Sequence, residues 1–504
     1  MSKRLILSFL IGSFFIFITH AESVTLAEVS GKIFSQQKEY GQPLHVNSHS
    51  SNAFPGDILP SIKKEDFEKA VGRLYDLFYT QLCESCLSLD NQASYIQKVT
   101  LDGDVRVVVI GDLHGSVHSL LRNLLRLNHD GFLDNNFKLA KNCYFIFTGD
   151  YADRGCYGVE VWYLLTRLKL ANSDRVFLIR GNHETGDIKD SSFNLELKHK
   201  YCDENLNNKI YDLFGFLPVA VLIGRGENYV MACHGGLPVN KSGEFLMCDE
   251  IKDFVEKKSD KNIDFMAIKS HEIIQQFLWN DFIDGGSIKV SHRNPEHAYE
   301  IGIENTEKMF ELYGFKALLR GHDHNKHAVI MYERNTKGLT VPDFGEFSIS
   351  FCENKGLRNN KLYSVSDKIF TFMSCPEGLG GVLARRALED CKKCNVDGYG
   401  ILHFDSATYA PTLKACGHEL PASEDRDRKY VRKIESDDGK LSFEWFDENI
   451  QDALLENEKE ALFEWLESSS SDEEHIRGGF YGSGKLSPEV RADMCDWLEG
   501  GFRL

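Results

Sequence analysis

Five apolar, strand-like runs between residues 105 and 322 each end at a polar side chain next to a glycine. The runs read VRVVVI, CYFIF, RVFLI, NYVMAC and ALLR, and the polar residues after them are Asp112 with His114, Asp150, Asn182, His234 and His322. Residues 65–82, 117–127 and 158–170 instead space their apolar residues like helices. Strands that are apolar at nearly every position are covered on both faces. The pattern therefore predicts an α/β protein in which strand layers pack between helices.

The polar strand ends predict a metal centre. One histidine after one strand is typical of an ordinary turn, but five such ends in succession are not explained by turns. Loops at the carboxyl ends of strands converge in α/β sheets, and glycines allow the backbone to approach closely. The expected ligands are Asp112, His114, Asp150, Asn182, His234 and His322. Their mixed oxygen and nitrogen donors favour manganese, with iron or zinc as alternatives, over calcium or a thiolate zinc site.

Two divalent metal ions fit this ligand set if Asp150 bridges them. One ion would then bind Asp112, His114 and Asp150, and the other would bind Asp150, Asn182, His234 and His322. Two such ions can hold a water, lower its pKa and stabilise displacement at phosphorus.

Three further residues lie beside these expected ligands and suit phosphoryl transfer. Arg154 can neutralise phosphate oxygens, although an arginine next to Asp153 could also form a simple surface salt bridge. His183 is the expected general acid for the leaving oxygen, with Asp153 orienting it and keeping it protonated.

The motifs GDLHG, GDYADRG, RGNHE and HGG, in this order, resemble those of the phosphoprotein phosphatases, a serine/threonine phosphatase family of the metallophosphoesterase superfamily. The resemblance extends over roughly residues 105–405. It implies a calcineurin-like β-sandwich flanked by helices, with the six metal ligands given above. It also implies phosphate binding by Arg154, Asn182 and His183, with Asp153 and His183 as the acid pair.

The resemblance thins after His234. FLWNDF at residues 277–282 lacks the family's proline and carries Asn280 in place of serine, and FMSCPEGLGG at 372–381 lacks its tyrosine and cysteine. The family supplies a second phosphate-binding arginine in this region, and Arg293 stands nearest to that place. A solvated loop cation is the simpler interpretation of Arg293, and Lys289 is the next candidate for the role.

The predicted function is metal-dependent hydrolysis of phosphoserine and phosphothreonine in proteins. A phosphotyrosine-preferring enzyme on the same scaffold and a dinucleotide-polyphosphate hydrolase are alternatives. A binding module without catalysis, acting through an acidic tail, is a rival from another class. The net charge of −18 argues against nucleic-acid binding.

The chain ends differ in composition from the centre. Residues 1–21 combine Lys3 and Arg4 with a short apolar run, the pattern of a secretory signal peptide, with an uncleaved anchor as the alternative. We expect an N-terminal extension at 22–98, the catalytic domain at 99–417 and an acidic extension at 418–504, without a membrane span after signal removal. The protein would be exported, as a bacterial effector or a lumenal enzyme.

The acidic extension and the cysteines are less informative. From residue 421 onward acidic residues outnumber basic ones 22 to 11, and the extension could bind a protein partner. Apolar spacing from residue 443 permits an amphipathic helix. Two CxxC pairs, at residues 83–86 and 391–394, suit disulfides in an exported protein, and Cys391, Cys394, Cys416 and His418 could instead form a zinc site.

Overall fold

The structure is a computed structural model that describes most of the central part of the chain. The described residues are 24–36, 61–85, 94–185, 192–259, 261–283, 285–323, 329–333, 362–374, 396–419, 431–435 and 441–445. The predicted signal peptide, three of the four CxxC cysteines and most of the acidic extension lie outside these residues, so the predictions made for them stay predictions. Among the helices of the described residues, none is both long enough and apolar enough to cross a membrane.

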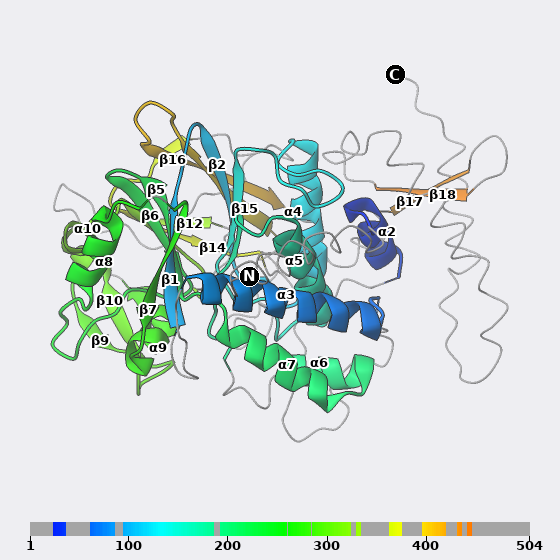
Figure 1. The fold of residues 1–504 in the computed structure, drawn as a ribbon, viewed down its shortest axis with the longest axis horizontal. Coiled ribbons are helices and arrows are strands. Elements are labelled where there is room, and N and C mark those ends of the chain that lie inside the picture. The colour runs from blue at the N-terminus through cyan, green and yellow to red at the C-terminus, as the bar shows by residue number, and fades with distance from the viewer. Residues whose placement is uncertain are drawn as a thin grey trace, which may run out of the picture.

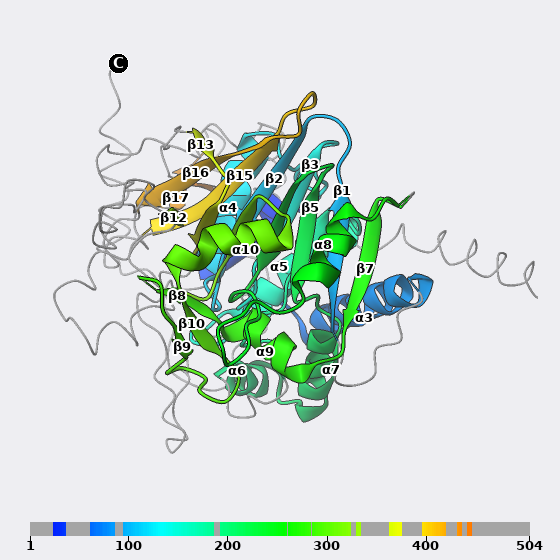
Figure 2. The ribbon, with the colours of Figure 1, turned by 90° about the vertical axis from the view of Figure 1, so that its left-hand side faces the viewer.

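Two large sheets form the centre of the molecule (Figures 1 and 2). The first has the strand order β12 (Val329–Glu333), β14 (Lys368–Phe372), β11 (Ala317–Arg320), β6 (Asn228–Cys233), β5 (Ala220–Arg225), β1 (Ser94–Thr100) and β7 (Ile263–Ile268). The second has the order β13 (Leu362–Ser364), β16 (Pro411–Glu419), β15 (Val396–Phe404), β2 (Val105–Ile110), β3 (Cys143–Phe147) and β4 (Val176–Leu178). Strands β2, β3 and β4 run parallel, as do β6, β11 and β14.

The two sheets pack face to face, and strand β2 shows why its sequence is apolar throughout. Val107 and Val109 belong to the core between the sheets, where they meet residues of the first sheet such as Val221. Val108 and Ile110 belong to the core on the opposite face, under the helices. Because side chains alternate along a strand, a strand covered on both faces is apolar at every position. The predicted β-sandwich flanked by helices is confirmed.

Helices cover the outer faces of both sheets. The core outside the second sheet takes side chains from α2 (Leu26–Gln36), α3 (Lys64–Glu84), α4 (Val117–His129), α5 (Gly158–Ala171), α6 (Ser192–Tyr201) and α7 (Glu204–Gly215). The core outside the first sheet takes them from α8 (Cys248–Glu256), α9 (His271–Trp279) and α10 (Thr306–Tyr313). A short sheet of β8 (Asp281–Ile283), β10 (Tyr299–Gly302) and β9 (Ile288–Val290) follows α9.

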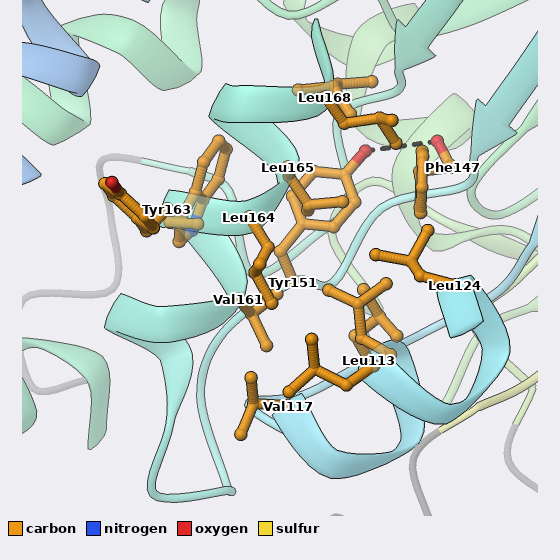
Figure 3. Packing of buried hydrophobic residues seen from close by; sticks show 14 of the residues in the cluster. Leu113, Val117, Leu124, Phe147, Tyr151, Val161, Tyr163, Leu164, Leu165 and Leu168 are labelled. Carbon is orange, nitrogen blue, oxygen red and sulfur yellow. Dashed lines mark hydrogen bonds between the residues drawn. The ribbon is translucent and has the colours of Figure 1, made fainter. Parts of the chain in front are cut away.

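The helical core anchors two loops that carry predicted ligands. Leu113 and Tyr151 are fully buried among residues of α5, including Val161 and Leu165 (Figure 3). The hydroxyl of Tyr151 lies within hydrogen-bonding distance of the carbonyl oxygens of Phe147 and Ile179, at 3.1 and 2.6 Å. A buried polar atom needs such partners, so the position of Tyr151 is well determined. Asp112, His114 and Asp150 are neighbours of these two anchors in the chain.

The C-terminal extension begins differently from the prediction. Residues 441–445, which include the first three residues of the stretch in which an amphipathic helix was expected, form strand β18 (Leu441–Trp445), which pairs antiparallel with β17 (Val431–Glu435). The helical interpretation is therefore wrong at Phe443 and Trp445. Leu441, Phe443 and Trp445 alternate with Ser442 and Glu444 at the period of a strand.

Candidate metal centre

The predicted ligands gather where the ends of the two sheets meet. Asp112, Asp150 and Asn182 follow β2, β3 and β4 of the second sheet, whereas His234 and His322 follow β6 and β11 of the first. All five are buried, with at most 1% of each residue exposed. Parallel strands bring their carboxyl ends to one edge, and the sandwich brings two such edges together. The convergence predicted from the strand ends is confirmed.

Asp150 lies at the centre of this group. Its Oδ2 atom is 3.3 Å from His114 Nε2 and 3.3 Å from His234 Nε2. Within the described residues, two sets of three side chains could each hold an ion: His114, Asp150 and His183, and Asp150, His234 and His322. Asp150 belongs to both sets, which is the arrangement that a bridging carboxylate requires.

An amide oxygen lies beside the second set. Asn182 Oδ1 lies 2.8 Å from His234 Nε2 and 3.0 Å from His322 Nδ1. The same two ring nitrogens are 3.2 Å apart. Two imidazole nitrogens and an amide oxygen thus turn toward one small volume. Such nitrogen and oxygen donors fit a divalent transition metal, so these residues can hold the predicted ion.

Backbone carbonyls fix the far side of two of these imidazole rings. His114 Nδ1 lies 3.1 Å from the carbonyl oxygen of Ala152, and His234 Nδ1 lies 2.9 Å from that of Thr148. Hydrogen bonds of this kind set the tautomer and leave the other ring nitrogen available for a metal.

Asp112 is placed differently from the other expected ligands. Its carboxylate accepts the backbone N–H of His322, at 3.1 and 3.0 Å from the two oxygens. Its Oδ1 atom is 3.8 Å from His234 Nδ1. The structure therefore brings Asp112 to the site but into neither of the two sets of three.

Burial and charge shift the pKa values of these groups. Burial alone would raise the pKa of Asp150, but the charges of His234, His183 and His114 outweigh burial and hold that pKa well below its ordinary value. Burial lowers the pKa of His234, and the charges of Asp150 and Asp112 overcome it and raise this pKa to about 9. The carboxylates thus stabilise positive charge in the site, and a bound cation would supply such a charge.

The structure brings His183 and Asp153 together. His183 Nδ1 lies 2.8 Å from Asp153 Oδ2, and His183 Nε2 lies 4.0 Å from Asp150 Oδ2. Arg154 Nη2 is 3.3 Å from the same His183 Nε2. With Nδ1 held by Asp153, Nε2 is the ring nitrogen that faces both Arg154 and the central carboxylate.

Several site residues have unusual backbone conformations. His114, Asp150, Asp153, Arg154 and His322 all have positive φ, at 42°, 53°, 67°, 71° and 69°. Residues other than glycine seldom adopt this conformation, and it is found preferentially at functional sites.

Arg293 also lies beside the site. Its Nη1 atom is 3.2 Å from Asp281 Oδ2 and 3.4 Å from the carbonyl oxygen of His322. Asp281 also binds Arg320, at 2.9 Å, so one carboxylate holds two guanidinium groups next to a predicted ligand. Arg293 therefore lies next to the site and pairs with Asp281, with 29% of its side chain exposed.

Two residues that the sequence did not single out take part in the site. Glu184 accepts the backbone N–H groups of Asp150, Tyr151 and Gly181, at 2.7 to 3.0 Å. Burial, followed by the charge of Asp150, raises its pKa to about 8. The second residue is Asp281, which binds Arg293 and Arg320. Glu184 belongs to the motif RGNHE and Asp281 to FLWNDF, so their positions in these motifs were the signal by which the sequence could have identified them.

The comparison of the chain with known families agrees with this geometry. The model of the family described as calcineurin-like phosphoesterase matches residues 105–326, which contain all the residues discussed above. Residues 105–326 are thus similar to the calcineurin-like phosphoesterases. The resemblance seen in the motifs of these residues is thereby confirmed.

The chain is also similar to protein phosphatases. The serine/threonine-protein phosphatase 4 catalytic subunit of Kluyveromyces lactis is 31% identical over 220 residues, which are 44% of this chain and 63% of that protein. Serine/threonine-protein phosphatase T of Saccharomyces cerevisiae is 30% identical over 317 residues, with 60% of this chain and 55% of that protein covered. The chain thus spans less than two thirds of the length of either relative.

A solved structure was also found. It is a protein serine/threonine phosphatase from Saccharomyces cerevisiae with similarity to human phosphatase PP5, with 19% sequence identity and a TM-score of 0.43. The match covers 71% of this chain and 92% of that chain.

Proposed function

We propose that the protein is a metal-dependent phosphomonoesterase that hydrolyses phosphoserine and phosphothreonine in proteins. The observation that carries this proposal is the position of Asp150, whose Oδ2 atom lies 3.3 Å from both His114 and His234. Two ion-binding sets that share a carboxylate are the hallmark of two-metal phosphate chemistry. The names of the two curated relatives support serine and threonine as the acceptor residues.

We propose the predicted metal ligands, and in this assignment Asp112 takes the place that His183 has in the first set of three side chains. Asp112, His114 and Asp150 would hold one ion, and Asp150, Asn182, His234 and His322 would hold the other. We propose manganese as the native metal, with iron or zinc as alternatives, because the donors are a mixture of oxygen and nitrogen. When bound, the ions would lower the pKa of a water molecule and withdraw charge from the phosphate oxygens.

The protein's own side chains would complete the reaction. Asp153 holds His183 through Nδ1, so Nε2 can carry a proton to the oxygen that leaves phosphorus. Arg154 lies next to that nitrogen and can bind a phosphate oxygen as a charged donor. Asn182 would contribute a further phosphate contact, and Arg293, held by Asp281, would bind the phosphate from the other side.

Phosphopeptides that differ only in the phosphorylated residue test this function. Purified protein supplied with Mn²⁺ should release phosphate from phosphoserine and phosphothreonine peptides faster than from the matched phosphotyrosine peptide. Faster release from phosphotyrosine would favour the alternative acceptor, and preferential cleavage of a dinucleotide polyphosphate would replace the proposal. Full activity after exhaustive chelation would refute it.

We further propose that the protein is exported and that its mature chain begins near Glu22, after the apolar segment that follows Lys3 and Arg4. N-terminal sequencing of protein made by its native host should give a start near Glu22. A chain that still begins at Met1 would instead support the anchor. A protein partner for the acidic residues 418–504 remains a prediction.

A further inference from the structure

A buried cluster of charges lies beside the loop that carries Asp153 and Arg154. Lys200 Nζ, on helix α6, is 2.5 Å from Glu160 Oε2, 2.8 Å from Glu196 Oε1 and 3.1 Å from the carbonyl oxygen of Cys156. The three charged side chains are completely buried. An ammonium group has three hydrogens to donate, and here it has three acceptors.

Glu196 connects this cluster to the start of helix α5. Its carboxylate accepts the backbone N–H groups of Gly158 and Val159, at 2.9 and 2.8 Å. Tyr157, which precedes α5, makes no capping hydrogen bond with its side chain. The first N–H groups of a helix need acceptors and favour negative charge, so a residue of α6 caps α5.

The first turn of α6 holds Asp153. The backbone N–H of Phe193 donates to Asp153 Oδ1 at 2.8 Å, and the hydroxyl of Ser192 lies 3.3 Å from the same oxygen. The hydroxyl of Ser192 also accepts the backbone N–H of Arg154, at 2.6 Å. The other oxygen of Asp153 is the one that binds His183.

Helix α6 therefore contacts residues 153–160 at both ends. Its first turn binds Asp153 and Arg154. One turn later Glu196 binds the start of α5, and one turn further Lys200 binds the carbonyl oxygen of Cys156. Asp153 and Arg154 have φ of 67° and 71°, a conformation that persists only when its surroundings enforce it. The contacts with α6 supply that enforcement.

We propose that Glu160, Glu196 and Lys200 are positioning residues that lock α6 against α5 and thereby hold Asp153 and Arg154 in their active geometry. The inference rests on the proposed phosphatase function and deepens it. Stability alone is a weak reason for such a cluster, because apolar residues of similar volume often replace buried ion pairs without loss.

Leaving-group dependence distinguishes positioning from a merely structural role. The alkoxide of phosphoserine needs a proton from His183 as it departs, whereas the nitrophenolate of p-nitrophenyl phosphate departs without one. A displaced Asp153 would leave His183 badly oriented and would slow only the first substrate strongly. General acids contribute roughly 10²- to 10⁴-fold, so partial displacement should cost on the order of 10-fold.

The test compares Lys200→Met with Lys198→Met, the same substitution at an exposed position of the same helix. For Lys200→Met, kcat on a phosphoserine peptide should fall about 10-fold further than kcat on p-nitrophenyl phosphate, at unchanged metal content. KM should rise for both substrates, because Arg154 is also displaced. The control should keep wild-type values. Equal losses of kcat on both substrates, in proportion to the folded fraction, would overturn the proposal.

A second variant and a readout without catalysis complete the design. Glu196→Gln, which is nearly isosteric, replaces Lys200→Met if that variant does not fold. It should show the same pattern of kcat losses with smaller amplitude. Hydrogen exchange at the amides of Phe193 and Gly158 should accelerate in both variants while strand β2 keeps its protection. Unchanged exchange at Phe193 would contradict the coupling. A wild-type protein that hydrolyses neither substrate would refute the proposed function, and the exchange data would still decide whether the cluster positions Asp153.

Discussion

The Nε2 atom of His234 lies 3.2 Å from the Nδ1 atom of His322. Both rings are buried, and Asn182 Oδ1 lies within 3.0 Å of both nitrogens. Buried polar atoms are costly to leave without compensation, and a cation between these three donors would satisfy them together. This relationship is the structural basis of the predictions on metal binding.

Asp150→Asn should be the most damaging change of a single ligand. Asp150 belongs to both ion-binding sets, so the substitution weakens both together, whereas Asn182→Ala affects one. Mutation of residues that only hydrogen-bond to metal ligands lowers activity roughly 10- to 100-fold, and Asp150→Asn should lower it further. Steady-state kinetics of the two variants on p-nitrophenyl phosphate provide the comparison. A loss no larger than that of Asn182→Ala would show that Asp150 does not bridge.

Arg293→Ala should lower kcat by on the order of 10²-fold, because a charged donor to the phosphate is lost in the transition state. Metal content should not change, since the guanidinium of Arg293 binds the backbone carbonyl of His322 and the carboxylate of Asp281, neither of which is a proposed metal-binding group. Lys289→Ala, which removes a cation paired with Glu300 in the same region, is the matched control. Near-wild-type kcat/KM for Arg293→Ala, with a large loss for Lys289→Ala, would transfer the role to Lys289.

The stability of the protein should depend on pH through Lys169. Burial lowers the pKa of this lysine to about 8, and its ammonium donates to the carbonyl oxygens of Ser173 and Val176. The unfolded chain, with a lysine pKa near 10.4, binds more protons than the folded chain between about pH 8 and pH 10.4. The lysine therefore penalises folding below this window, and the penalty disappears as the pH rises through it.

Lys169→Met isolates this effect. Relative to the variant, the wild type should gain up to about 3 kcal/mol of unfolding free energy between pH 7.5 and pH 10.5. Urea unfolding of the wild type and of Lys169→Met at both pH values measures the gain. A difference between wild type and Lys169→Met that does not change with pH would contradict the assignment.

The sequence predicted the parts of the fold whose signals are local. The runs at 105–110, 143–147 and 228–233 are strands, as predicted, because short apolar stretches rich in β-branched residues and bounded by turn residues favour the strand conformation. The carboxyl ends of these strands then located Asp150 and His234. Motif order and strand ends were sufficient for this because the convergence of parallel strands follows from topology.

Other parts depend on tertiary contacts that no local pattern encodes. Helix α6 has apolar and charged residues without a clear face, and its role appears only when Glu196 is seen to cap α5. Strand β1 carries Gln97 and Lys98 in a buried position, where Lys98 donates to two carbonyl oxygens near the end of α8. The partner of Arg293 could not be predicted either, because Asp281 is brought to it by the small sheet of β8, β9 and β10.

The stoichiometry of metal binding tests the central claim most directly. Chelator-treated protein should be dialysed against Mn²⁺, and the bound metal should be measured against protein concentration, alongside Asp150→Asn. The shared carboxylate predicts two ions for each wild-type chain and weakened binding of both ions in the variant. One ion or none in the wild type, or two ions bound equally well by Asp150→Asn, would contradict a two-metal centre bridged by Asp150.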